Sequence, residues 1–354
     1  MKSSNLSETT GKPSEITHSK NLASIKNKRR QKKSSETLAR ELMSGSITAL
    51  SQAITVIESS HPDHYEDAST LLKLCLPKAK QSVRIGITGV PGVGKSTFIE
   101  SFGNYLTEIG KKVAVLTVDP SSSLSKGSIL GDKTRMETLV KNDHAFIRPS
   151  ASGTSLGGVA RKTRETIVLC EAAGYDTILI ETVGVGQSET AVHSMVDFFL
   201  LLKLAGAGDQ LQGIKRGIME MADCIAINKA DGENLKAAQL AKVDFERALH
   251  LYPQKLSGWQ PQVLTCSALK NEGIAAIYST IEAYIKQAKD TGYFESNRKD
   301  QHKFWLMQTI ESRLKTDFFG NAKIKKELDK QLELIELGKT TAFMAAEKLL
   351  ELRS

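Results

Sequence analysis

The chain of 354 residues lacks the features that mark membrane, secreted and disulfide-bonded proteins. Even the apolar run Phe198–Leu202 is bracketed by Asp197 and Lys203 and falls far short of the roughly 18–20 residues of a membrane span. The polar N-terminus has no apolar segment of the secretory type. Four scattered cysteines without a C-x-x-C pair suit a reducing compartment. We expect no membrane partner and a cytoplasmic location, or the mitochondrial matrix if the source is eukaryotic.

Excess charge is also absent from most of the chain. The formal net charge is +8, but residues 1–35 hold nine Lys and Arg against two Glu, a net +7, which leaves +1 for the rest. Polar composition with few apolar residues predicts a disordered basic tail over 1–35. Contact of residues 26–33 with an anionic surface, or an organellar presequence, stays open. We expect no nucleic-acid partner.

Short apolar runs alternate with helical patterns from residue 83 onwards. Strands are predicted at 83–89, 113–119, 145–148, 177–182, 198–204, 224–228 and 263–266, and helices at 95–109, 132–141, 158–173, 210–221, 233–251 and 272–287. This alternation predicts an α/β fold with a mostly parallel sheet flanked by helices. Ligands of such sheets bind at the carboxyl ends of the strands.

Helical periodicity also flanks this central region. Residues 36–58 and 64–76 each predict an amphipathic helix, 290–302 a polar linker, and 303–353 a helical arm whose apolar stripe needs a partner surface. The stripe consists of Phe304, Met307, Ile310, Leu314, Ile324, Leu328 and Leu332. We therefore divide the chain into a tail (1–35), N-terminal helices (36–80), a central domain (81–290) and a C-terminal helical arm (291–354).

A phosphate-binding motif follows the first predicted strand. It matches G-x-x-x-x-G-K-[ST] between a strand and a helix, the context that a P-loop requires. Its backbone N–H groups surround phosphate oxygens, its lysine reaches the β- and γ-phosphates, and its serine hydroxyl ligates Mg²⁺. The predicted nucleotide-binding residues are Gly89, Val90, Pro91, Gly92, Val93, Gly94, Lys95, Ser96 and Thr97.

Two further motifs predict that the nucleotide is GTP or GDP. Asn228, Lys229 and Asp231 form an N-K-x-D motif after a strand, and Ser267, Ala268 and Leu269 follow the last strand. A carboxylate at Asp231 accepts hydrogen bonds from guanine N1–H and the 2-amino group, a donor pair that adenine lacks. The S-A-L loop resembles one whose backbone N–H reads guanine O6.

Acidic residues near the same sheet edge are candidates for Mg²⁺ binding and catalysis. Glu181 ends an apolar strand in a Walker-B-like position, where a carboxylate ligates Mg²⁺ directly or through water. Asp119 and Asp132 lie in loops at that edge, although Asp132 also suits an N-cap of the helix predicted at 132–141. Gln187 stands three residues after Gly184, so it is not assigned to orient the attacking water. The glycine-punctuated segment 206–217 suits reordering around a γ-phosphate.

Taken together, these motifs resemble the methylmalonyl-CoA mutase-associated GTPases, the MeaB/ArgK group of metallochaperone-type P-loop GTPases. The resemblance rests on G-V-P-G-V-G-K-S-T, V-D-P-S-S, G-D-K-T-R-M, E-T-V-G-V-G-Q-S-E, A-G-A-G-D-x-L-Q-G-I-K and N-K-A-D, and it spans residues 36–350. It implies a GTPase that assists adenosylcobalamin loading and protection of methylmalonyl-CoA mutase. It also implies a homodimer joined through the C-terminal arm.

The resemblance assigns roles residue by residue. Lys95, Asp119, Glu181 and Lys215 become the catalytic candidates, and Ser96, Asp119, Asp132 and Glu181 become the Mg²⁺ candidates. Lys215 would lie in a switch segment that responds to the mutase; the alternative is a solvated helix residue. GTPases that insert nickel or cobalt need Cys/His clusters, which this sequence lacks. A stand-alone or protein-targeting GTPase, or one serving another cobalamin-dependent acyl-CoA mutase or another metalloenzyme, remains the alternative.

Overall fold

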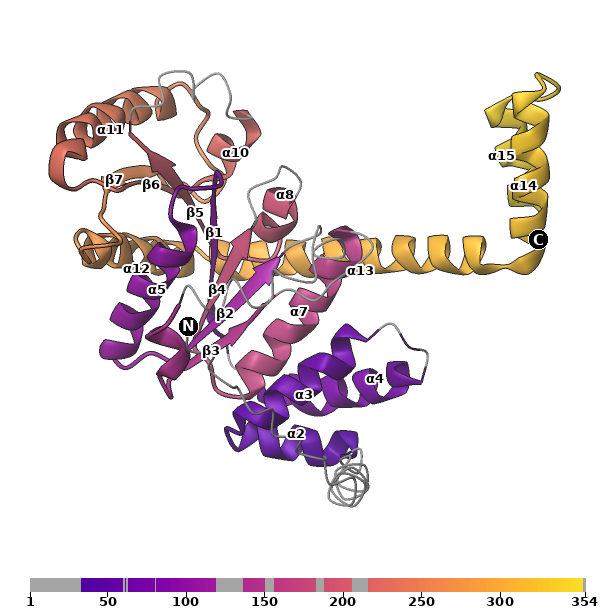
Figure 1. Ribbon diagram of the computed structural model, residues 1–354, viewed down its shortest axis with the longest axis horizontal. Coiled ribbons are helices and arrows are strands. Elements are labelled where there is room, and N and C mark those ends of the chain that lie inside the picture. The colour runs from indigo at the N-terminus through magenta and orange to yellow at the C-terminus, as the bar shows by residue number, and fades with distance from the viewer. Residues whose placement is uncertain are drawn as a thin grey trace, which may run out of the picture.

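Seven parallel strands form a single sheet at the centre of the molecule (Figure 1). The computed structural model describes residues 33–59, 61, 63–79, 81–118, 136–149, 156–182, 188–205 and 216–352. The strands are β1 Val83–Gly89, β2 Val113–Val118, β3 Ala145–Arg148, β4 Thr177–Thr182, β5 Phe198–Leu204, β6 Cys224–Asn228 and β7 Gln262–Thr265. Their order is β3-β2-β4-β1-β5-β6-β7, and every pairing is parallel. The predicted α/β class with a parallel sheet is confirmed.

Helices cover both faces of the sheet. Helices α5 (Lys95–Glu108) and α12 (Ile274–Asp290) pack on one face, against the side of β1 that carries Ile85 and Ile87. The other face carries α7 (Leu156–Ala172), α8 (Ser188–His193), α10 (Arg216–Met221) and α11 (Leu235–Leu249). On this side α8 approaches β1 closely, because a Cβ at Gly86 would lie 3.1 Å from Val192 Cγ1 of α8. The same Cβ would lie 2.8 Å from Phe199 Cδ2 of the neighbouring β5.

Three N-terminal helices pack on α7 and share one apolar core with it. They are α2 (Ser35–Met43), α3 (Ile47–Glu58) and α4 (His64–Cys75), followed by the 3₁₀ turn η1 (Leu76–Lys78). The single helix predicted over 36–58 is wrong. Gly45 adopts a left-handed φ of 92°, and the Ser46 hydroxyl accepts a hydrogen bond from Ala49 N and caps α3, so the chain breaks there.

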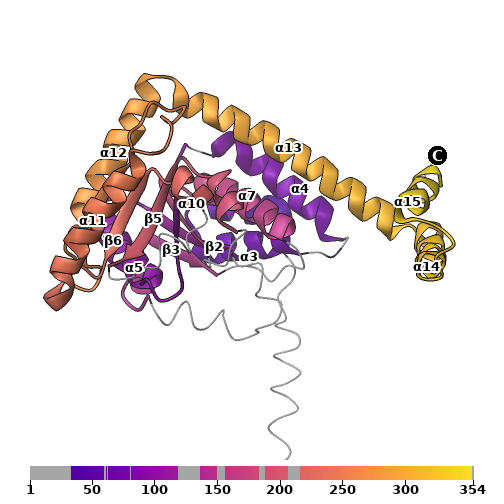
Figure 2. The ribbon, with the colours of Figure 1, turned by 90° about the horizontal axis from the view of Figure 1, so that it is seen from above.

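Helix α13 (Tyr293–Gly320) begins where a linker was predicted over 290–302, and that prediction is wrong. The buried face of its first turns is Phe294, Arg298, Gln301 and Trp305, which has helical spacing but is half polar. Apolar periodicity in the sequence therefore did not indicate that a helix begins here. Figure 2 shows α13 running from the end of α12 across the body of the molecule, where it contacts α7, and then out beyond it.

Two short helices stand at the far end of α13. Helices α14 (Ala322–Glu336) and α15 (Ala342–Glu351) pack on each other and bury Ile324, Ala345 and Leu349. The predicted arm is helical, but part of its apolar stripe finds a partner inside the arm. Other stripe residues remain 40–51% exposed, namely Phe304, Met307, Ile310, Leu314 and Leu332.

Several predicted boundaries need adjustment. The helix predicted at 132–141 is wrong within the described residues, because Met136–Thr138 form no helix and only the 3₁₀ turn η2 (Leu139–Lys141) follows. Strand β7 begins and ends one residue earlier than predicted. The tail was predicted over 1–35; residues 1–32 lie outside the described residues, and the predicted end is one residue too late, because Ser34 caps α2 and Ser35 begins it. The start of the helix predicted at 210–221 also lies outside the described residues, up to residue 215. Among the helices described, none is long and apolar enough to cross a membrane.

All four cysteines lie inside the fold as free thiols. Burial raises the pKa of the Cys75 thiol to about 11 and that of Cys266 to about 12. Burial likewise raises the pKa of Cys170 and of Cys224. The thiolate, which is the reactive form, is therefore suppressed at every native cysteine.

Candidate functional site

The P-loop connects the carboxyl end of β1 to the N-terminus of α5. Gly92 and Gly94 have left-handed φ values of 82° and 93°, which turn the backbone tightly. At Gly94 a side chain has no room, because a Cβ would lie 2.9 Å from Asn228 Nδ2. Pro91 and Thr97 are exposed, whereas Val93 is buried. The predicted strand–loop–helix context of residues 89–97 is therefore present.

Lys95 lies folded back beneath this loop. Its ammonium donates to Gly89 O at 2.8 Å and to Val90 O at 3.3 Å, and the residue is only 9% exposed. Burial lowers the pKa of Lys95, while the nearby carboxylates of Glu181 and Glu189 oppose that shift. Two acidic side chains thus favour the charged ammonium, the form that binds phosphate.

Glu181 stands at the penultimate position of β4 and is buried. It pairs in register with Ile87 of β1 and Thr117 of β2, two and one residues before those strands end. Strand alternation places it on the same face as Leu179, towards α5 and its half-buried Ser96. A carboxylate and a hydroxyl are oxygen donors of the kind that Mg²⁺ prefers, so these two residues fit that ion.

The N-K-x-D loop is tied directly to the P-loop. Asn228 Nδ2 donates to Val93 O at 2.9 Å, and Lys229 Nζ donates to Gly92 O at 3.0 Å. Asn228 Oδ1 in turn accepts from Ala268 N at 3.1 Å. One buried amide therefore joins the phosphate loop, the N-K-x-D loop and the S-A-L loop.

Asp231 and Ser267 face each other at the outer side of this junction. The Ser267 hydroxyl donates to Asp231 Oδ2, and Lys270 N donates to Ser267 Oγ at 3.2 Å. The N–H groups of Ser267 and Ala268 donate to Glu272 O and Asn228 Oδ1. Leu269 is 80% exposed, and among the described residues its N–H has no recorded acceptor. A partly exposed carboxylate next to an available N–H matches the donor and acceptor pattern of a guanine edge.

The structure brings together most, but not all, of the predicted site residues. The P-loop, Glu181, Asn228, Lys229, Asp231 and the S-A-L loop converge on the carboxyl edge of β1, β4, β6 and β7. Asp119, Asp132, Gln187 and Lys215 lie outside the described residues. Within the described part of the chain, no three His, Cys, Asp or Glu side chains gather as a metal site.

Sequence reasoning missed Glu189. This second residue of α8 is 3% exposed, and its carboxylate acts electrostatically on Lys95. The acid stands in Gln187-Ser188-Glu189, just beyond the strand that ends at Thr182. A helix of six residues is too short for periodicity to show which side faces inwards.

A parallel sheet that joins a P-loop and its buried lysine to an N-K-x-D loop defines a P-loop nucleotide-binding protein of the GTPase class. Residues 50–323 match the family model described as "Methylmalonyl Co-A mutase-associated GTPase MeaB". The chain belongs to this family and is a GTPase, as the sequence resemblance indicated.

Known relatives agree with this assignment. A GTPase of Mycobacterium tuberculosis is 48% identical over 315 residues, covering 89% of this chain and 94% of that protein. The mouse protein named methylmalonic aciduria type A homolog, mitochondrial, is 42% identical over 320 residues, covering 88% of this chain and 77% of that protein. A crystal structure described as an LAO/AO transport system kinase matches with a TM-score of 0.72 and 38% identity, covering 90% of this chain and 97% of that one.

Proposed function

We propose that this GTPase is a metallochaperone-type protein that assists the loading of adenosylcobalamin into methylmalonyl-CoA mutase and protects the mutase. The observation that carries the proposal is the family match over residues 50–323, whose description names that mutase. The mouse relative named for methylmalonic aciduria supports the same client. The protein would work in the compartment of the mutase, the cytoplasm or, in a eukaryote, the mitochondrial matrix.

Magnesium is part of this proposal. The Ser96 hydroxyl and the buried Glu181 carboxylate would hold the ion. Asp119 and Asp132, which lie outside the described residues, are the further ligand candidates. Mg²⁺ neutralises charge on the β- and γ-phosphates during phosphoryl transfer. The chain itself supplies the Lys95 ammonium, the P-loop N–H groups and the orientation of the nucleotide.

A homodimer joined through the C-terminal arm is also part of this proposal. Large apolar side chains remain exposed along α13 and on α15, where Phe343 is 75% exposed and Met344 is 62% exposed. Apolar surface of this extent on a projecting arm favours association with a second copy, which would bury the same patch on both subunits.

The test is GTP hydrolysis with and without methylmalonyl-CoA mutase. The mutase should raise the rate by about tenfold or more, since ordering of switch segments supplies missing transition-state contacts. Lys215→Ala should blunt this rise and leave GDP affinity intact, whereas Lys236→Ala on the exposed side of α11 should change neither.

Two outcomes decide between clients. Activation by a different cobalamin-dependent acyl-CoA mutase, but not by methylmalonyl-CoA mutase, would move the proposal to that client. A mutase that neither binds nor changes the rate would overturn the chaperone role and leave the GTPase assignment standing.

A further inference from the structure

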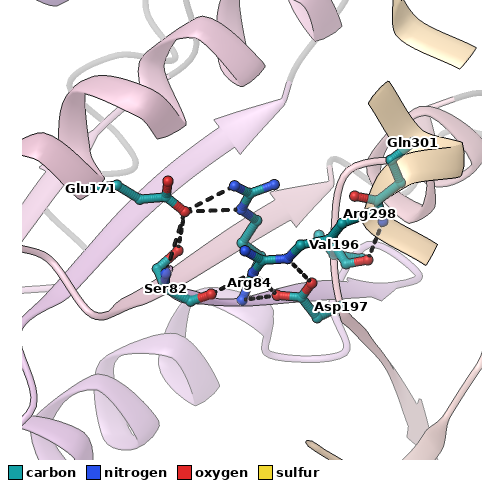
Figure 3. A network of polar contacts seen from close by, with 7 residues as sticks. All are labelled: Ser82, Arg84, Glu171, Val196, Asp197, Arg298 and Gln301. Atoms are coloured by element: carbon teal, nitrogen blue, oxygen red, sulfur yellow. Dashed lines mark hydrogen bonds and ion pairs between the residues drawn. The ribbon is translucent and has the colours of Figure 1, made fainter. Parts of the chain in front are cut away.

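Three side chains on one face of α13 form hydrogen bonds with the short segment that links α8 to β5. Gln301 Nε2 donates to Val196 O at 2.7 Å, and Trp305 Nε1 donates to Ser194 O at 3.1 Å. The Arg298 guanidinium binds the carboxylate of Asp197, with its Nε 2.8 Å from Oδ1 and its Nη2 2.7 Å from Oδ2. We call Arg298, Gln301 and Trp305 the α13 clamp, and Figure 3 shows its first two members with their partners.

The clamp is anchored in buried polar contacts at the amino end of the sheet (Figure 3). Asp197 Oδ2 also accepts from Arg84 N of β1 at 2.8 Å, and Arg298 Nη2 donates to Ser82 O at 2.5 Å. Arg298, Gln301 and Asp197 are 8%, 7% and 4% exposed. Breaking one partner of such a pair leaves a buried charge or polar group unsatisfied, so the contacts hold one geometry tightly.

The segment that the α13 clamp holds is joined to the P-loop region through α8. Ser194 follows the last residue of α8, whose first turn carries the buried Glu189. Between these ends, Val192 packs against β1 at Gly86, three residues before the P-loop begins at Gly89. One short helix therefore connects the carbonyls held by α13 to the carboxylate that acts on Lys95.

We propose that Arg298, Gln301 and Trp305 are positioning residues for GTP hydrolysis: by holding the Ser194–Asp197 segment they fix α8, which packs on β1 three residues before the P-loop and carries the buried Glu189. A movement of the arm would then displace α8 and the P-loop without any contact between α13 and the nucleotide. This inference uses only the GTPase activity and does not depend on the mutase.

The first test removes one clamp hydrogen bond at a time. Trp305→Phe keeps an aromatic ring beneath the Arg164 guanidinium, 4.6 Å from the Trp305 ring, but loses the N–H donor to Ser194 O. Gln301→Met keeps the side-chain length but loses the donor to Val196 O. Each should lower kcat for GTP about threefold to tenfold and leave the Kd for GDP within about twofold, the range of coupling through packed networks. Lys299→Ala, exposed on the same helix, is the matched control.

The second test is a double-mutant cycle between Trp305→Phe and Glu189→Gln. If the clamp acts through α8, the double variant should lose clearly less kcat than the product of the two single losses, since both changes disturb one arrangement. Independent, multiplying losses of kcat would overturn the proposal. So would clamp variants of lowered Tm whose kcat equals that of Lys299→Ala.

Discussion

At the scale of single residues, we expect the Asp231 carboxylate to be the group that separates guanine from adenine. In the structure it accepts from the Ser267 hydroxyl and stays partly exposed at the outer side of the loop junction. Asp231→Asn replaces one acceptor oxygen with a donor, which opposes the guanine N–H groups. We expect the preference for GDP over ADP to fall by about 1–3 kcal/mol, measured by calorimetric titration of both nucleotides. Lys299→Ala, exposed on α13 and away from this loop junction, should leave that preference unchanged.

Lys203 is a buried cation that the nucleotide site does not use. It is 2% exposed, and its ammonium lies 5.9 Å from the centre of the Phe245 ring on α11. Burial lowers the pKa of Lys203 from 10.5 to about 8. Between these two values the unfolded chain binds the extra proton, so stability should rise with pH from about 8 to about 10.

Lys203→Met tests how much the burial of this charged ammonium lowers the stability of the fold. The variant should be more stable at pH 7 by about 3 kcal/mol, the equivalent of the shift in pKa, and this advantage should shrink above pH 8. Denaturant unfolding at several pH values measures both effects, with the exposed Lys236→Met as control. An advantage that does not change between pH 7 and pH 10 would contradict the assigned cause.

Site residues in contiguous motifs could be predicted from the sequence because local chemistry determines them. The P-loop and Asn228 to Asp231 need particular residue types at fixed spacing, and both lie where expected. Glu189 could not be predicted, since its burial depends on how α8 packs across β1. Its effect comes from tertiary structure rather than from a motif.

At the scale of elements, Asn228 holds three loops in one arrangement. Asn228→Ala would leave Val93 O and Ala268 N without their partner inside the fold. Each lost partner costs about 1–3 kcal/mol, so Tm should fall and GDP affinity should fall at least about tenfold. Thermal unfolding with and without GDP measures both. Lys270→Ala, exposed in the same region, should leave both unchanged, and an equal loss there would contradict the special role of Asn228.

Strands and most helices could be predicted because their apolar patterns report burial directly. The start of α13 could not be, since Arg298 and Gln301 are buried by hydrogen bonding to Asp197 and Val196 O rather than by apolar contact. Polar residues at these positions suggest a solvent-exposed helix face in the sequence alone. Their burial becomes evident only from their hydrogen-bond partners, which lie about 100 residues earlier in the chain. The break between α2 and α3 needed only Gly45 and Ser46, a local signal that the apolar periodicity masked.

At the scale of the whole molecule, truncation of the arm can separate the proposed dimerisation from nucleotide binding. A chain ended after Gln308 keeps the α13 clamp and loses Ile310, Leu314 and both terminal helices. We expect light scattering to give about twice 38.7 kDa for the full chain. The shortened chain should be a monomer that still binds GDP. A full chain that remains monomeric at micromolar concentration would contradict the proposed dimer.

The buried thiols make this GTPase a convenient object for spectroscopy. Because all four native cysteines are enclosed and held as thiols, alkylating dyes and spin labels should leave them untouched in the folded protein. A cysteine placed at the exposed Lys339, in the turn between α14 and α15, would then be a single attachment point without any prior removal of native residues. Pairs of labels on two arms could follow their separation as GTP is exchanged for GDP.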